Sequence, residues 1–213
     1  MSKAATSRKE REEQVQRAEF LVVAERLFAT NGYHETKISD IAREAEYGVG
    51  TLYKLFENKQ NLYQCLVEIK VDELHERIRY DVEQCSGVLQ KIRTLIDSSL
   101  EVFDSHRQFL LIYLKEVLEA NEPIKPVASE KMQGKIEEHK EFITQIFRDG
   151  VEQGLLRSHN AEDYTLALAG IVMKIIGSRV ISGQPIDLQR DGDFIYEFFN
   201  HGALVDRACP AEG

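Results

Sequence analysis

The sequence predicts an all-α protein with a three-helix N-terminal domain and a larger helical second domain. Three observations support this fold class. Residues 36–59 read as two short helices joined by a tight turn, apolar residues recur three and four positions apart through most of the chain, and only four prolines occur in 213 residues. We expect about nine helices in total. A length of 213 residues suits one small domain plus one larger one.

The first helix of the N-terminal domain is expected to end at Asn31-Gly32, since glycine commonly follows a helix. The next helix is predicted just after Thr36. Thr36 or its neighbour is a candidate to cap the first turn, and Asp40 stands where a helix N-terminus favours an anion. Its buried face is marked by apolar residues spaced three and four apart, namely Ile38, Ile41, Ala42 and Ala45.

Gly48 is expected to form the turn, because glycine adopts backbone angles that other residues avoid. The second short helix then runs from about Val49 to Phe56, with Leu52 and Phe56 one turn apart and facing inward. Asn58 is a candidate cap for the following helix. Lys59 in its first turn opposes the helix dipole, which suggests a nearby phosphate. The outward-facing residues are Gly50, Thr51, Tyr53 and Lys54.

This arrangement is a helix-turn-helix, which places its second helix in the major groove of DNA. Residues 15–65 resemble the N-terminal domain of TetR-family transcriptional repressors, most specifically through the spacing Gly50-Thr51-Leu52-Tyr53-x-x-Phe56-x-x-Lys59. The resemblance implies a flexible arm over 1–14, a DNA-binding domain over 15–58 and an effector-binding and dimerisation domain over 59–213. The expected DNA-facing residues are Thr36, Lys37, Tyr47, Val49, Gly50, Thr51, Tyr53, Lys54 and Lys59.

The chain departs from the family pattern after Ala45. That pattern usually reads Gly-Val-Ser, and here the residues are Glu46-Tyr47-Gly48. The serine that would cap the recognition helix is absent, and Val49 stands where a polar residue often reaches DNA. The roles of these altered residues stay open: Val49 is a candidate contact for a thymine methyl, and Tyr47 reaches a phosphate or packs.

The net charge of −9 is unusual for a DNA-binding protein, but it is unevenly distributed. In residues 1–60 ten Lys and Arg balance ten Asp and Glu, so the whole excess of acid lies in residues 61–213. An acidic second domain discourages nonspecific binding of DNA to its own surface. The basic residues before the first helix have two interpretations, a solvated helical extension of mixed charge or an arm that contacts phosphate.

The second domain reads as a series of amphipathic helices. Asn160 is a candidate cap, Gly154 a candidate stop signal, and Asp193 the expected start of the last helix. The expected helices cover about 58–82, 88–103, 106–119, 132–154, 160–182 and 193–199, with a loop at 121–127.

The last two helices form the expected dimer surface. Residues 164–181 are apolar nearly all round, and such a helix must be covered on every side. In the TetR family the last two helices of each subunit form a four-helix interface; the alternative is a core within one chain. A dimer also suits a palindromic operator. The expected interface residues are Gly170, Lys174, Gly177, Ser178, Ile181, Phe194 and Phe198.

The resemblance further implies a pocket for a small-molecule effector among the middle helices. His139 lies on an apolar stripe and is a candidate ligand contact, although many such histidines are ordinary core residues. Glu116 is a candidate carboxylate for a cationic ligand. The expected lining is Ser99, Phe103, Phe109, Tyr113, Glu116, His139, Ile143, Phe147 and Met173.

Other classes of function find little support in the sequence. The six histidines and three cysteines form no metal-ligand pattern, no nucleotide-binding fingerprint or catalytic dyad occurs, and no cofactor is expected. The N-terminus lacks the apolar core of a signal peptide, and the apolar run 166–173 is too short to span a bilayer, so we expect a cytoplasmic protein.

The leading hypothesis is a homodimeric, ligand-released repressor that is not an enzyme. A first alternative is a helix-turn-helix regulator controlled by a protein partner or by thiol oxidation. A second is a helical enzyme or carrier that has kept a degenerate helix-turn-helix.

Overall fold

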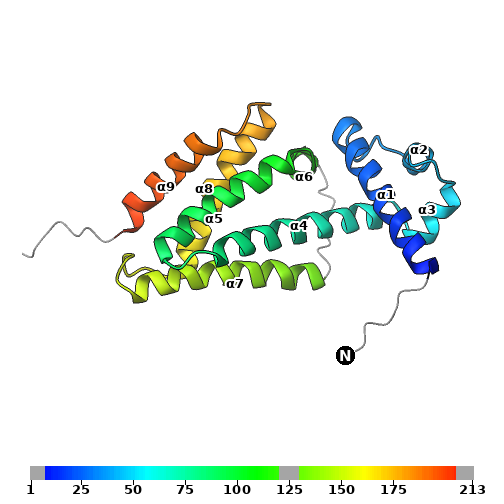
Figure 1. Cartoon of the computed structure of the whole chain (residues 1–213). Helices are drawn as coiled ribbons and strands as arrows, with labels where there is room; N and C mark the ends of the chain where they lie inside the picture. The colour runs from blue at the N-terminus through cyan, green and yellow to red at the C-terminus, as the bar shows by residue number, and fades with distance from the viewer. Residues whose placement is uncertain (1–7, 120–129, 205–213) are drawn as a thin grey trace, which may run out of the picture. The chain divides into compact units, whose positions relative to one another are not determined.

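The structure, a computed structural model, describes residues 8–119 and 130–204. The expected loop at 121–127 therefore lies outside the described residues. Two compact units are present, and Figure 1 labels their helices. The first comprises Met1–Lys70 with Gln108–Val127, and the second comprises Val71–Arg107 with Ala128–Gly213.

The first unit begins with α1 (Arg8–Asn31), α2 (Ile38–Glu44) and α3 (Val49–Leu55). Since α1 starts at Arg8, residues 8–14 of the expected arm are helical. The three helices pack on one another around an aromatic core, in which the Phe20 and Phe56 rings meet edge to face at 6.4 Å. Gly32 has φ of 86° and ends α1, which confirms the expected stop.

The helix α4 (Lys59–Glu83) contributes residues to both units. It opens as predicted, because the side chain of Asn58 accepts a hydrogen bond from the Asn61 N–H at 2.8 Å. Its first part packs in the first unit, where the Tyr63 ring lies 5.9 Å from that of Phe28. The helix α6 (Arg107–Glu119) groups with the first unit from Gln108 onward.

The second unit contains the later part of α4 with α5 (Val88–Ser105), α7 (Glu130–Glu152), α8 (Ala161–Ile181) and α9 (Leu188–Ala203). α5 packs on α7, α8 and α9, and α8 lies between α7 and α9. A buried hydrogen bond of 2.9 Å joins the Thr144 and Thr165 hydroxyls across α7 and α8. The Arg179 guanidinium donates to the buried Asp191 carboxylate at 2.8 Å, which links α8 to α9 and lowers the pKa of Asp191.

Two helices of the second unit end in the same hydrogen-bonded turn. α7 ends with Gly154 at φ 65° and α8 with Gly183 at φ 69°. In each turn the glycine N–H and the next N–H bond back to carbonyls of the last helical turn, which is the Schellman motif. The glycine stops expected from the sequence are thus confirmed. The side chain of Asn160 caps α8 as predicted, accepting from the Glu162 N–H at 3.0 Å.

The expected start of the last helix at Asp193 is wrong. α9 begins at Leu188, and its cap is Asp187, whose side chain accepts from the Arg190 N–H at 3.0 Å. Asp193 lies more than one turn inside the helix, where its carboxylate accepts from the Arg93 guanidinium at 2.6 Å. Both aspartates look like caps in the sequence, and the ion pair with α5 decides the role of the second.

By length and composition alone, α8 is apolar enough to cross a membrane, so the shorter apolar run judged from the sequence understated it. In the structure Leu168, Val172 and Ile176 on α8 are buried within the unit. A buried core helix passes the same test of composition.

Candidate DNA interface and effector cavity

The turn between α2 and α3 is a Schellman motif built on a glutamate. The Tyr47 N–H donates to the Ala42 carbonyl at 2.9 Å, and the Glu46 N–H to the Arg43 carbonyl at 3.1 Å. Glu46 has φ of 60°, whereas Gly48 has ordinary extended angles of −71° and 145°. The expectation that Gly48 provides the special backbone angle is therefore wrong. The left-handed residue is Glu46, where the TetR pattern has glycine.

Tyr47 packs against the domain. Its hydroxyl donates to the Glu19 carboxylate at 2.6 Å, and its ring lies 5.2 Å from that of Phe20. The hydrogen bond to Glu19 is the main cause of the raised pKa of Tyr47. Of the two roles left open by the sequence, the structure favours packing.

The solvent face of α3 carries most of the expected DNA-facing residues. Tyr53 is 54% exposed and Val49 40%, and Gly50 and Lys54 are also exposed. Beneath them Leu52 and Phe56 are buried, so this face is held by an apolar base. Thr51 is half-buried on α3, and Lys37 is exposed at the start of α2.

The side chain of Thr36 does not face solvent. It is 1% exposed, and its hydroxyl oxygen lies 2.8 Å from the Gly32 carbonyl oxygen. The cap residue of α2 is Lys37, which makes no side-chain cap bond. Both expectations for Thr36, helix cap and DNA contact, are corrected, because its hydroxyl bonds back to the end of α1.

Lys59 is a structural clamp in this conformation. Its ammonium donates to the carbonyls of Tyr33, His34 and Thr36 at 2.9, 3.1 and 3.0 Å, and it lies 4.4 Å from the centre of the Tyr33 ring. An ammonium has three protons to donate, so three carbonyls satisfy it. In this arrangement neutral carbonyl oxygens of the α1–α2 loop accept from the ammonium, and the expected phosphate contact stays a prediction.

Arg17 holds the end of α3. Its guanidinium donates to the Leu55 carbonyl at 2.8 Å and lies 4.4 Å from the centre of the Phe56 ring.

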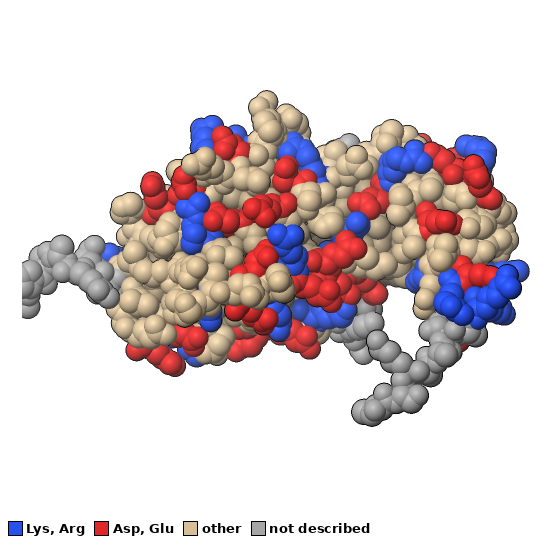
Figure 2. Space-filling view, in the orientation of Figure 1, with Lys and Arg blue, Asp and Glu red and all other residues tan. Residues whose placement is uncertain are grey.

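Residues before Arg17 on α1 are mostly exposed, and Figure 2 shows blue Lys and Arg side chains gathered where α1 begins. Two of these, Arg8 and Lys9, form ion pairs with glutamates four residues later on α1. These pairs agree with a solvated helical extension and do not exclude phosphate contact.

The second unit encloses a cavity of about 180 Å³ between α4, α5, α7 and α8. The structure places five of the expected residues on its wall. The remaining lining residues were missed, although several lie on the apolar stripes of α4 and α5, because a stripe does not reveal which part of it borders a cavity. The expected five are Ser99, Phe103, His139, Ile143 and Met173, and the missed ones are Leu74, His75, Ile78, Leu95, Thr165, Leu168, Ala169 and Val172.

Three expected pocket residues that the structure describes do not line this cavity. Phe147 is fully buried in an aromatic cluster, with its ring 5.7 Å from Tyr164 and 5.6 Å from Phe199. Phe109 and Tyr113 lie on the part of α6 that groups with the first unit. The side chain of Glu116 lies outside the described residues.

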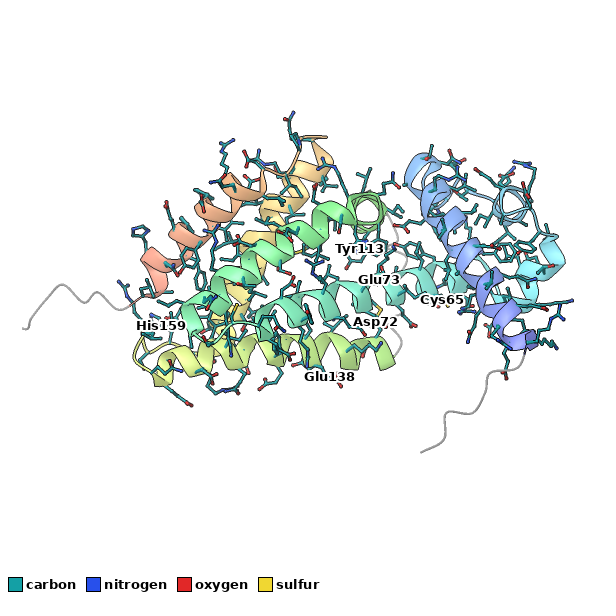
Figure 3. All side chains as sticks on the ribbon, in the orientation of Figure 1. Cys65, Asp72, Glu73, Tyr113, Glu138 and His159 are labelled. Carbon is teal, nitrogen blue, oxygen red and sulfur yellow. The ribbon has the colours of Figure 1, made fainter. Side chains whose placement is uncertain are left out.

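A second, polar hollow of about 150 Å³ shares His75 and His139 with the cavity. Figure 3 labels Asp72 on α4 and Glu138 on α7, which both border it. The Lys135 ammonium pairs with the Asp72 carboxylate across it. The Arg79 guanidinium lies 4.7 Å from the centre of the Phe142 ring. The other lining residues are Glu76, Arg79, Lys135, His75 and His139.

Most of the expected dimer residues are exposed. Phe194 and Phe198 on α9 are 56% and 61% exposed, and their rings stack at 5.9 Å. On α8 the exposed members are Gly170, Lys174, Ser178 and Ile181. Gly177 is already buried within the single chain, so it is removed from the expected interface.

Comparisons with known proteins agree with this architecture. Residues 20–66 match the family of bacterial regulatory proteins called tetR. The chain is 22% identical over 179 residues to the fatty acid metabolism regulator protein of Bacillus subtilis, covering 83% of this chain and 89% of that protein. It is 26% identical over 142 residues to the transcriptional repressor KstR2 of Mycobacterium tuberculosis, covering 66% and 69%.

A solved structure shares the fold over most of the chain. FadR from Bacillus subtilis in complex with stearoyl-CoA has a TM-score of 0.75 and 19% identity, covering 87% of this chain and 98% of that one. At this identity the likeness concerns the fold.

Proposed function

We propose that this chain, which belongs to the TetR family of bacterial regulatory proteins, is a homodimeric repressor released from its operator by a small molecule. The family is one of DNA-binding transcriptional regulators and not of enzymes. Its relatives include a fatty acid metabolism regulator and the repressor KstR2. We place the protein in the cytoplasm, where its DNA target would be.

The observation that carries the proposal is that one helix serves both candidate sites. At its start, α4 holds the α1–α2 loop through Lys59, and further along it contributes Leu74, His75 and Ile78 to the cavity. A ligand that changes the position of α4 at the cavity also acts on the helix that anchors the DNA-binding helices. A coupling of roughly 1–3 kcal/mol would weaken operator binding about 5–150-fold.

DNA recognition is assigned to the exposed face of α3. Tyr53 and Lys54 supply a phenol and a cation, and Gly50 allows close approach of the backbone, since nothing lies within 4 Å of a Cβ built there. Val49 offers an apolar contact for a thymine methyl. Lys37 at the start of α2 adds a cation.

Dimerisation is assigned to the exposed stripe of α8 and α9. Phe194, Phe198 and Ile181 are each more than half exposed, which leaves a large apolar area uncovered in a single chain. Two copies joined there would present two α3 helices to half-sites about 34–36 Å apart on a palindromic operator.

The thiol-oxidation alternative gains little support from Cys65. Burial raises the pKa of this thiol, although Arg17 partly opposes the shift. A protonated thiol is a poor nucleophile, so the site lacks the usual feature of a redox sensor.

The test is selection of genomic DNA fragments by the purified protein at moderate salt, followed by sequencing. One enriched palindrome, bound by a dimer, is the expected result. Tyr53→Ala should remove the enrichment, and Lys140→Ala on α7 of the second unit is the control. Enrichment that survives Tyr53→Ala would contradict the assignment of α3, and an absence of any enriched site would contradict the function.

A further inference from the structure

The cavity and the polar hollow meet at a pair of stacked imidazoles. The His75 and His139 rings lie 3.8 Å apart and only 5° from parallel. Both residues line both spaces. The pair therefore forms the one wall where the apolar cavity adjoins polar surroundings among the described residues.

Besides its two histidines the cavity offers few polar groups, and the two hydroxyls on its wall already have hydrogen-bond partners. The Ser99 hydroxyl donates to the Leu95 carbonyl at 2.6 Å. The Thr165 hydroxyl lies 3.1 Å from the Ala161 carbonyl oxygen and 2.9 Å from the Thr144 hydroxyl. No Asp, Glu, Lys or Arg occurs among its lining residues.

His139 differs from these two hydroxyls. Its Nδ1 is buried and has no hydrogen-bond partner within the described chain. A buried polar atom without a partner costs about 1–3 kcal/mol, so a group that reaches it gains by pairing with it. The imidazole thus offers a polar anchor on an otherwise apolar wall.

We propose that the cavity takes a compact, uncharged, largely apolar molecule bearing a hydroxyl group, and that His139 recognises this hydroxyl. The inference rests on the proposed effector cavity and names its ligand class. A hydroxyl both donates and accepts, so it pairs with either tautomer of a neutral imidazole.

An anionic ligand fits the site less well. Burial lowers the pKa of His75 to about 4 and that of His139 to about 3, so neither imidazole carries a positive charge at neutral pH. In the polar hollow the carboxylates of Asp72, Glu76 and Glu138 outnumber the cations Arg79 and Lys135. A carboxylate or polyphosphate head would meet more acid than base there.

The experiment compares three probes of one shape, namely para-butylphenol, butylbenzene and para-butylbenzoate. Binding to the purified full chain is measured by calorimetry at neutral pH, without DNA. The phenol should bind about 5-fold more tightly than the hydrocarbon, because one hydrogen bond to a buried partner contributes about 1 kcal/mol. The benzoate should bind most weakly.

The matched variant is His139→Phe, which keeps an aromatic ring against His75 and removes the nitrogen. It should bring the phenol to the affinity of the hydrocarbon and leave hydrocarbon binding unchanged, which also reports an intact cavity. The control is Glu141→Gln, an exposed residue of α7 that lines neither space, and both affinities should stay within about twofold.

Three results would overturn the inference: no binding of the phenol, equal phenol binding by His139→Phe and the wild type, or tightest binding of the benzoate with a dependence on Arg79. The proposed function is tested separately, by measuring operator affinity with and without the phenol. A phenol that binds through His139 but leaves operator affinity unchanged would contradict the release mechanism and leave the ligand assignment standing.

Discussion

The DNA-binding helices and the proposed effector cavity differ in how far apart in the sequence their residues lie. The face of α3 is built from residues within one short helix, Val49–Leu55, on a base formed by Leu52 and Phe56. The cavity joins residues from Leu74 on α4 to Met173 on α8. A local site can be recognised from spacing, whereas an assembled one depends on packing angles that the spacing does not specify.

The largest effect is expected for a substitution in the core of the first unit, which tests whether the two units unfold independently. Phe56→Ala removes a ring that is 1% exposed and should destabilise the first unit by about 3–5 kcal/mol, because it leaves a cavity. Urea unfolding followed by circular dichroism measures the loss. Probe binding in the second unit should survive in conditions where operator binding is gone; loss of both together would show that the two regions unfold as one.

The second test concerns the clamp at the start of α4. Lys59→Ala removes the donor to three carbonyls and should cost about 1.5–3 kcal/mol of stability, as expected for hydrogen bonds to a charged group. Operator affinity should fall with it, because the loop before α2 loses its support. Weaker DNA binding with unchanged urea stability would instead restore Lys59 as a direct phosphate contact.

The third test uses pH to address the second region. The unfolded histidines bind protons below about pH 6.5, whereas His75 and His139 in the folded chain stay neutral until about pH 4 and 3. The unfolded state therefore binds more protons between those values, and stability falls as the pH drops through this window.

Asp72 favours the charged form of His75, Lys135 opposes it, and Arg79 opposes the charged forms of both histidines. Allowing for partial solvent screening, the loss from pH 7 to pH 5 should be on the order of 1–3 kcal/mol. His139→Phe should reduce this slope in urea titrations at the two pH values. An equal slope in variant and wild type would assign the acid sensitivity to other groups.

The smallest effect is expected for the exposed lysine of α3. Lys54→Ala should weaken operator binding by about 5–10-fold and lower the salt slope by about one, without changing stability. Fluorescence anisotropy with labelled operator at several salt concentrations measures both. An unchanged salt dependence of operator affinity would show that Lys54 does not contact phosphate. Lys54 and Lys59 would then no longer differ as a DNA contact and a structural residue.

The same difference between local and distant partners explains which features of the fold could be predicted from the sequence. The caps at Asn58 and Asn160 and the stops at Gly32 and Gly154 were correct, because each is a local signal. The predicted helix start at Asp193 was wrong because Asp187, six residues earlier, caps the helix, and the carboxylate of Asp193 instead pairs with Arg93 of α5.

The candidate sites follow the same rule. The exposed residues of α3 lie where the spacing predicts. The intrachain partners of Thr36 and Lys59 were missed, since these partners lie across the α1–α2 loop and not beside the two residues in the helix. His75 was missed because nothing in the sequence of α4 marks it as the neighbour of His139 on α7.

The left-handed turns of the described chain also show where a single substitution would raise its stability. The same Schellman turn occurs after α2, α7 and α8, with glycine at its left-handed position in two cases and Glu46 in the third. A side chain in that conformation costs about 1 kcal/mol that glycine avoids. The chain has therefore kept its helix-turn-helix below the stability within reach of a single substitution, and the bond between Tyr47 and Glu19 offsets part of the difference.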